Sequence, residues 1–491
     1  MKLEFRLIHD LPRLAWAAHL HRDPWNMEVL HGPWVEVRPD CFFEGAWNGP
    51  FELCRFDEAA TMAGSGGRLT GDRVVFVTPN HLNERLYSFR AGGELFVSNS
   101  LPFVLTLAGQ QLDPGYPHYF LDFRDFHRAG ISVTKKQLRL LGPQAVELHD
   151  CCNLAVTPDL AIARIEKPQP PRPRDYHDYV SFLERTLADV AANASDPARG
   201  RTYRMVTMLS QGYDSTAVSA LASRAGCREA VTYRKSASGY GYVDDSGTAI
   251  AAHLGLDITE YERWDYDKLP ESRDDEFYVD PRGGDPSLVL MERQLMCSLL
   301  LSGRGGLNWG PPHRPLRHWG FPSENGLPLY RVPGRKLLGG ASLGEFRLKT
   351  GFIHFPLSYS GRIHSPVLQD LSVSEAMQPW SIGGAYDCPI ARRIAEEAGV
   401  PRHLFGQVKK GGPGRKPAVA RSFRRRTIDL LEDLSLWAPT RALFTRLLRS
   451  RFGWQRSFFV QRGVERLMER YRAAIFDGQI RDSTQRLRAL K

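Results

Sequence analysis

The sequence predicts an α/β protein in which a strand-rich first part precedes a parallel sheet with helices on both faces. Before residue 167, short runs rich in β-branched and aromatic residues, such as 73–77 and 85–89, are typical of strands. After residue 174, apolar strand-like runs alternate with segments whose apolar residues have helical spacing. This alternation is typical of a doubly wound sheet, in which ligands bind beyond the carboxyl ends of the strands.

A proline-rich segment separates the two parts. Residues 167–174 contain four prolines in eight residues, which favours an extended, stiff connector. We therefore expect a first domain over 1–166, a linker over 167–174, a second domain over 175–420 and a basic helical region over 421–491.

The individual elements follow from local patterns. In the first domain, a glycine-containing turn at 91–94 joins the runs 85–89 and 95–97 into a hairpin. In the second domain, the pattern predicts helices at 175–194, 215–222, 246–254 and 287–297, strands at 203–209, 230–233 and 257–261, and an apolar run at 298–303. From residue 427 onward the pattern predicts helices.

The chain is basic, with 65 Lys and Arg against 55 Asp and Glu, and the excess lies at its end. Residues 421–491 hold 17 basic and 7 acidic side chains, while the rest of the chain is balanced. Such a region attracts a nucleic acid, an anionic surface or an acidic partner, but a solvated helical face explains it equally well. It lacks interleaved aromatic residues and zinc-binding pairs, so nucleic acid is not the partner that we expect.

The sequence also contains features that predict the cellular location of the protein. No apolar run reaches the length of about 18 residues that a membrane helix requires, and the first residues lack the apolar centre of a secretory signal. The seven cysteines are too scattered for a disulfide framework. We expect no membrane span and a cytoplasmic location.

The most informative stretch is 209–216, LSQGYDST, between an expected strand and an expected helix. Backbone N–H groups at a helix N-terminus bind phosphate oxygens, and Gly212 lets a ligand approach the backbone closely. Ser210 and Ser215 add hydroxyl groups, and Asp214 offers a hard oxygen ligand for Mg²⁺. The stretch fits a nucleotide's pyrophosphate with its metal, although it is not a GxxxxGK[ST] loop.

The pattern Ser210-x-Gly212-x-Asp214-Ser215 resembles the SGGxDS loop of the N-type ATP pyrophosphatases, in particular of the asparagine synthetase family. Other segments of that family have similar counterparts here in the same order, at 83–105, 245–261, 301–305, 362–369 and 408–412. The resemblance covers residues 73–416.

The resemblance implies a glutaminase-like α+β domain of the Ntn type, followed by a doubly wound ATP-pyrophosphatase domain. It implies that a substrate carboxylate attacks the α-phosphate of ATP, with Mg²⁺ bound, and that an amine then displaces AMP from the acyl-adenylate. By the same resemblance, Lys409 or Lys410 is the catalytic lysine, with Lys409 favoured. The residues expected at the adenosine are Met208, Thr232, Tyr233, Ser302 and Gly303.

The sequence departs from the pattern of the asparagine synthetase family at two places, and both change the expected chemistry. Position 2 is Lys2 where glutamine-using relatives carry cysteine, so we expect ammonia or a substrate amine, and not glutamine, as nitrogen donor. The segment after Ser302 has Leu307 and Asn308 where relatives carry an acidic pair, which weakens Mg²⁺ binding.

Three functions therefore remain open at this point. The first is a ligase that joins a small-molecule or peptide carboxylate to an amine as an amide or lactam. The second is a catalytically degenerate nucleotide-binding scaffold or partner protein, and the third, ranked last, is an enzyme acting on tRNA. The oligomeric state also stays open, and a homodimer is compatible with the sequence.

Overall fold

The computed structural model describes residues 2–81, 83–113, 116, 136–236, 243–269, 286–303, 343–360, 364–382 and 387–408. The described strands form three sheets, one mixed, one antiparallel and one parallel, and helices pack against them. The α/β class predicted from the sequence is confirmed in this general form. The expected region 421–491 lies outside the described residues, as does the segment 304–342 with Leu307 and Asn308.

The first sheet has seven strands in the order β1-β3-β2-β9-β8-β11-β10. Its strands are β1 Lys2–Leu7, β2 Trp16–His21, β3 Asn26–His31, β8 Leu86–Ala91, β9 Glu94–Ser98, β10 Lys136–Arg139 and β11 Ala145–His149. The pair β1–β3 is parallel and the other pairs are antiparallel. The hairpin predicted around residues 91–94 is confirmed, because β8 and β9 pair through Ala91 and Glu94.

The second sheet has six antiparallel strands in the order β13-β12-β7-β6-β5-β4. They are β4 Glu36–Arg38, β5 Cys41–Trp47, β6 Met62–Thr70, β7 Arg73–Val77, β12 Asn153–Val156 and β13 Ile162–Ile165. Trp16 of the first sheet packs between Phe42 and Phe76 of the second, and its indole N–H donates to Ser65 Oγ at 3.1 Å. The two sheets thus share one buried core.

Helices cover the outer faces of this sandwich. Helix α1, Leu101–Leu107, is capped by Ser100 and packs against the first sheet. Helix α3, Tyr176–Ala194, is capped by Asp175 and packs against Ala46 and Ala63 of the second sheet. The helix predicted at 175–194 is therefore confirmed.

The third sheet is parallel, with the order β16-β15-β14-β17-β18. Its strands are β14 Arg204–Met208, β15 Glu229–Tyr233, β16 Asp257–Tyr261, β17 Ser298–Leu301 and β18 Ile353–Phe355. The chain moves outward from β14 through β15 to β16, then crosses back to β17 on the other side of β14. The strand order therefore reverses between β14 and β17, which is where sheets of this kind bind ligands.

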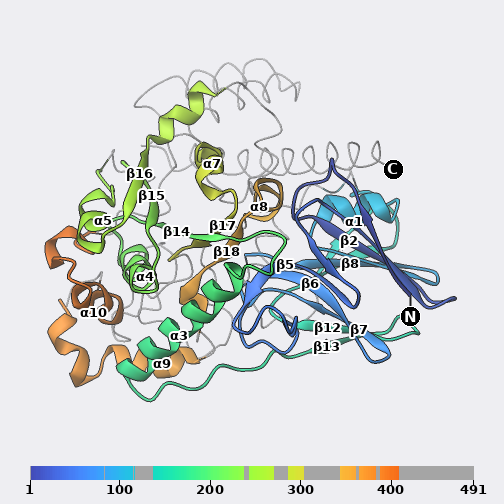
Figure 1. The fold of residues 1–491 in the computed structure, drawn as a ribbon, viewed down its shortest axis with the longest axis horizontal. Coiled ribbons are helices and arrows are strands. Elements are labelled where there is room, and N and C mark those ends of the chain that lie inside the picture. Colours follow the sequence, from blue (N-terminus) through green and yellow to red (C-terminus); the bar gives the residue numbers. More distant parts are fainter. Residues whose placement is uncertain are drawn as a thin grey trace, which may run out of the picture.

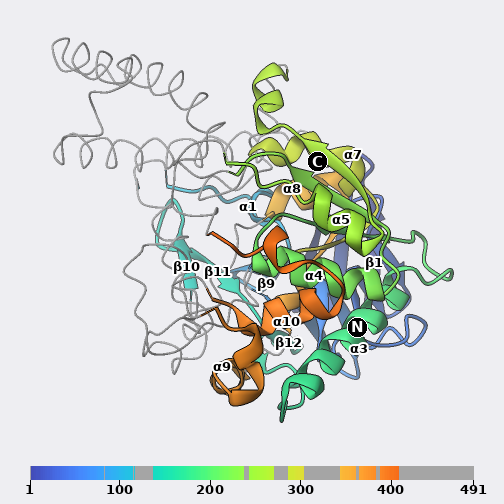
Figure 2. The same cartoon turned by 90° about the vertical axis from the view of Figure 1, so that its left-hand side faces the viewer.

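Helices lie on both faces of the parallel sheet. One face is covered by α3, α4 Tyr213–Arg224, α5 Thr248–Leu254, α9 Ser365–Ser372 and α10 Pro389–Glu397. The other face is covered by the 3₁₀ helix η3 Pro286–Met291, by α7 Glu292–Leu295 and by α8 Gly344–Thr350. Figures 1 and 2 show α4 and α10 side by side on the first of these faces.

The helix predicted over 287–297 is confirmed in part, because the segment is helical through Leu295 but is not one continuous α-helix. That segment forms η3 followed by the single turn α7, and Cys297 has a positive φ of 55°. Leu288, Met291 and Leu295 are buried. The spacing of three between Leu288 and Met291 suits the three residues per turn of a 3₁₀ helix, so burial did not require an α-helix.

The sandwich and the parallel sheet are joined by a buried ion pair. Arg347 of α8 contacts both carboxylate oxygens of Glu44 on β5, at 2.6 and 2.9 Å. The proline-rich segment 167–174 has neither helix nor strand, and its Lys167 is buried. His364 Nε2 lies 2.8 Å from the carbonyl oxygen of Pro170, so the segment is tied to the second half of the chain.

The remaining short elements are η2 Arg263–Lys268, η5 Leu357–Tyr359, η7 Glu375–Trp380 and η8 Arg402–Leu404. In the described part of the chain, no helix combines the length and the apolar character needed to span a bilayer.

Candidate functional site

The loop between β14 and α4 lies at the carboxyl end of the central strand of the parallel sheet. Strand β14 ends at Met208 and α4 begins at Tyr213, with Gly212 as its N-cap in extended conformation. Gly212 makes no side-chain cap hydrogen bond, and Asp214 stands in the first turn of the helix. The positive end of the α4 dipole thus points to the end of the sheet where the strand order reverses.

Hydroxyl groups hold this loop in shape. Ser210 Oγ and Ser215 Oγ are 2.8 Å apart, and the backbone N–H of Ser210 donates to Ser215 Oγ at 3.2 Å. The Thr216 hydroxyl donates to the carbonyl oxygen of Gly212 at 2.8 Å. The structure therefore brings together Ser210, Gly212, Asp214 and Ser215 in one turn, and the two serines brace the loop against itself.

The end of β17 contacts the same turn. A Cβ atom on Gly303 would lie 2.5 Å from the carbonyl carbon of Asp214 and 2.7 Å from its Cβ. Only a residue without a side chain fits so close to another backbone. Gly303 and its neighbour Ser302, both predicted from the sequence, therefore lie beside the predicted metal ligand Asp214.

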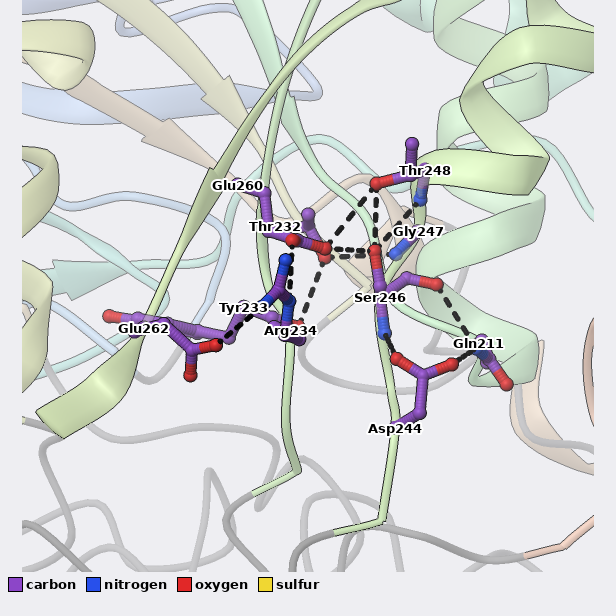
Figure 3. A network of polar contacts seen from close by, with 10 residues as sticks. All are labelled: Gln211, Thr232, Tyr233, Arg234, Asp244, Ser246, Gly247, Thr248, Glu260 and Glu262. Carbon is purple, nitrogen blue, oxygen red and sulfur yellow. Dashed lines mark hydrogen bonds and ion pairs between the residues drawn. The ribbon is translucent and has the colours of Figure 1, made fainter.

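A polar network fixes the loop against the next two strands (Figure 3). Gln211 Nε2 donates to Asp244 Oδ2 at 2.9 Å and to the carbonyl oxygen of Ser246 at 3.1 Å. The backbone N–H of Gly247 donates to Thr232 Oγ1 at 3.0 Å, and Gly247 packs against Leu209. The ends of β14 and β15 are thereby bound to the start of α5.

The network continues to β16. The Ser246 hydroxyl donates to Glu260 Oε2, and Arg234 pairs with Glu260 at 3.0 Å and with Glu262 at 3.2 Å (Figure 3). These carboxylates and this guanidinium lie along the carboxyl ends of β15 and β16. They form a charged rim beside the loop.

The residues predicted at the adenosine have different surroundings. Met208 is half-buried at the end of β14. Thr232 is buried and bonded to Gly247, and the Tyr233 hydroxyl accepts a hydrogen bond from Ser287 at 2.9 Å while Arg263 lies over its ring. Thr232 thus joins the network of the loop, and Tyr233 packs on the face covered by η3.

A distant segment also reaches the loop. The backbone N–H of Gly406 donates to the carbonyl oxygen of Gln211 at 2.8 Å, and a Cβ on Gly406 would meet the ring of Tyr213 at 2.3 Å. The predicted catalytic residues Lys409 and Lys410 follow this segment in the sequence and lie outside the described residues.

A buried chain of contacts connects the site to the sandwich. Ser302 Oγ lies 2.8 Å from His354 Nε2, and His354 Nδ1 lies 3.9 Å from Glu84. Glu84 in turn pairs with Arg347 at 2.9 Å. Burial raises the pKa of Glu84 to about 7, even though Arg347 opposes this shift.

Three residues of this network, Gln211, Ser246 and Glu260, could not be predicted from the sequence, because their roles depend on partners from other strands. One signal was available, since Gln211 lies inside the motif 209–216 and has a side chain long enough to reach a neighbouring strand.

Comparisons with known proteins give little support for any assignment. No family model matches the chain, and no curated protein matches it. Among solved structures, the chain has a weak similarity to one described as the structure of the allosteric regulatory enzyme of purine biosynthesis. That match has 10% sequence identity and a TM-score of 0.14. It covers 68% of this chain and 66% of the other chain, so this chain spans just under two thirds of the length of the other.

Proposed function

We propose that the protein is an ATP-dependent carboxylate–amine ligase that resembles the asparagine synthetase family. Its first part would be a glutaminase-like domain of the Ntn type, and its parallel sheet would be the ATP-pyrophosphatase domain. The substrate would be a small-molecule or peptide carboxylate, and the amine would be ammonia or an amine of the substrate itself.

One observation carries this proposal, namely the contact of Gly303 with Asp214. It joins a glycine-containing loop at a helix N-terminus to the neighbouring strand end, at the point where the strand order reverses. Anionic ligands of open α/β sheets bind at such points, because helix N–H groups and strand ends converge there.

The residues of the loop suit a triphosphate. The α4 N-terminus would bind the pyrophosphate oxygens and stabilise the charge that develops when the bond between the α- and β-phosphates breaks. A new bond forms between the substrate carboxylate and the α-phosphate, and pyrophosphate leaves. The amine then attacks the acyl carbon of the acyl-adenylate, an amide forms, and AMP leaves. We propose that Lys409 or Lys410 stabilises the negative charge at the acyl group.

Magnesium fits the donors that the loop presents. Asp214 supplies a carboxylate, and Ser210 and Ser215 supply hydroxyl oxygens, all hard ligands of the kind that Mg²⁺ prefers. Bound there, Mg²⁺ would neutralise charge on the phosphates. Asp214 would hold the ion, and the hydrogen bonds of Ser210 and Ser215 would hold Asp214's turn in place.

The experiment is an assay for AMP and pyrophosphate. The full chain is incubated with ATP, Mg²⁺ and a panel of amino acids and peptides, and products are measured by chromatography. We expect carboxylate-dependent AMP release that Asp214→Asn abolishes and that Asp189→Asn, an exposed residue on α3, leaves unchanged. Equal turnover by Asp214→Asn would contradict the mechanism. Addition of glutamine should release no glutamate.

A further inference from the structure

A cluster of two histidines and one glutamate lies on the outer face of the first sheet, far along the chain from the loop described above. Ala18 and Leu20 of β2 point into the sandwich core, so His19 and His21 emerge together on the opposite face. Glu94 of the adjacent strand β9 stands directly opposite His21. The pleat and the strand register therefore bring three potential metal ligands to one place.

The spacing of the ligand atoms suits a tetrahedral ion. Glu94 Oε1 lies 3.1 Å from His19 Nε2 and 3.4 Å from His21 Nδ1. Three such atoms, all within 4.8 Å of one another, can share one cation. In a tetrahedral zinc site with bonds of about 2.0–2.1 Å, neighbouring ligand atoms are separated by about 3.3–3.4 Å. The two distances from Glu94 Oε1 to the histidine nitrogens are close to that separation.

The surroundings of the cluster hold the imidazole of His19 in place. The ring of His19 stacks on Phe96 with centroids 4.3 Å apart. Glu28 of β3 stands opposite His19 and adds negative charge near the site. Together these features provide nitrogen lone pairs and charge for a divalent cation.

A second cluster of the same composition is less suited to a metal. His81, Glu84 and His354 are buried together, but Arg347 already pairs with Glu84 at 2.9 Å. The backbone N–H of Asn83 donates to His81 Nδ1 at 3.3 Å and occupies that lone pair. A cation there would meet a guanidinium, whereas the cluster on β2 and β9 has a histidine pair facing a carboxylate.

We infer that His19, His21 and Glu94 form a binding site for Zn²⁺ or a divalent cation with the same preference for nitrogen and carboxylate ligands. The side chains of His21 and Glu94 are 36% and 43% exposed, so the fourth position of a tetrahedral ion would be open to water or a small anion. The site is separate from the proposed ligase chemistry and does not depend on it.

The test is zinc binding by the full chain, measured by competition with a chromogenic chelator after treatment with EDTA. We expect one equivalent of Zn²⁺ to bind tightly. His21→Asn and Glu94→Gln should each weaken binding at least tenfold. The matched control His9→Asn changes an exposed histidine outside the cluster and should leave the affinity unchanged. Cobalt substitution should give the intense visible absorption of a tetrahedral ion in the parent and not in the variants.

Circular dichroism establishes that each variant is folded, and Glu94→Gln preserves the shape of the side chain. Absence of tight zinc binding by the parent would overturn the inference. So would an affinity in both variants equal to that of the parent and of His9→Asn.

Discussion

Gly303 and Asp214, 89 positions apart in the sequence, are in contact so close that a Cβ on Gly303 would lie 2.5 Å from the carbonyl carbon of Asp214. This contact sets the distance between β17 and the first turn of α4. The position of the Asp214 carboxylate relative to the loop therefore depends on the absence of a side chain at residue 303.

Gly303→Ala should displace this turn. Because the neighbouring atoms belong to the backbone and Cβ of Asp214, they can move only if the first turn of α4 shifts, and we expect a destabilisation of about 1–3 kcal/mol. If this displacement reaches the site, binding of MgATP, measured by calorimetry, should weaken about fivefold or more, the effect of a loss of about 1 kcal/mol. Gly200→Ala is the control, since its added Cβ would have no atom within 4 Å. If both variants bind MgATP equally, the contact does not position the site.

Gln211 should matter for binding more than for folding. Gln211→Met removes the amide that donates to Asp244 and to the Ser246 carbonyl, and the loss of such hydrogen bonds typically costs about 0.5–1.5 kcal/mol. We therefore expect MgATP affinity to fall about threefold to tenfold while the thermal midpoint changes little. Gln137→Met on β10 removes an exposed hydrogen bond to Glu147 on β11 and should leave the affinity for MgATP intact. An unchanged affinity in Gln211→Met would show that the network does not shape the loop.

Arg347 should contribute strongly to stability. Arg347→Met would leave Glu44 and Glu84 buried without their cation, a situation that typically costs about 3–5 kcal/mol. The comparison is Arg224→Met, which breaks a partly exposed pair with Glu184 and should cost no more than about 1 kcal/mol. Urea denaturation of both variants checks the difference. If the free energy of unfolding falls by a similar amount in Arg347→Met and Arg224→Met, the buried pair does not join the two parts of the fold.

His149 should make the fold sensitive to acid. It is buried beside Ser88, with His149 Nε2 and Ser88 Oγ 2.8 Å apart, and burial lowers its pKa to about 4. Between pH 6.5 and 4 the unfolded chain therefore binds more protons at this position than the folded chain, so stability rises with pH and is lost on acidification. At about 1.4 kcal/mol per pKa unit, the loss across this window is up to about 3 kcal/mol.

The thermal midpoint measured against pH tests this assignment. His149→Gln should give a flatter curve between pH 6.5 and 4 than the parent, and His253→Gln, at an exposed position on α5, should follow the parent. A parent-like slope in His149→Gln would assign the acid sensitivity to other groups.

The sequence predicted the loop well because its structure is local. A buried strand, a glycine and an apolar helix between residues 203 and 222 dictate where β14 ends and α4 begins, and the structure has both elements there. The segment expected as one helix at 287–297 is a 3₁₀ helix followed by one α-helical turn, because a 3₁₀ helix buries the same apolar residues equally well.

The contacts that complete the site could not be predicted, because they join distant residues. Gln211 meets Asp244 across 33 positions, and Arg347 meets Glu44 across 303 positions. Likewise, His21 and Glu94 face each other only through the register of β2 with β9. Such pairings depend on the order of strands in the sheets, which composition and spacing do not encode.

We propose that the loop from Ser210 to Ser215 binds the phosphates of MgATP, with Asp214 at the metal. Isothermal titration calorimetry of the full chain with MgATP tests it most directly, with Asp214→Asn as the variant and Asp189→Asn as the matched surface control. We expect the parent and Asp189→Asn to bind with equal affinity and Asp214→Asn to bind at least about tenfold more weakly, the effect of losing one charged contact worth about 1.4 kcal/mol or more. The proposal would be contradicted if the parent failed to bind MgATP, or if Asp214→Asn bound it as tightly as the parent.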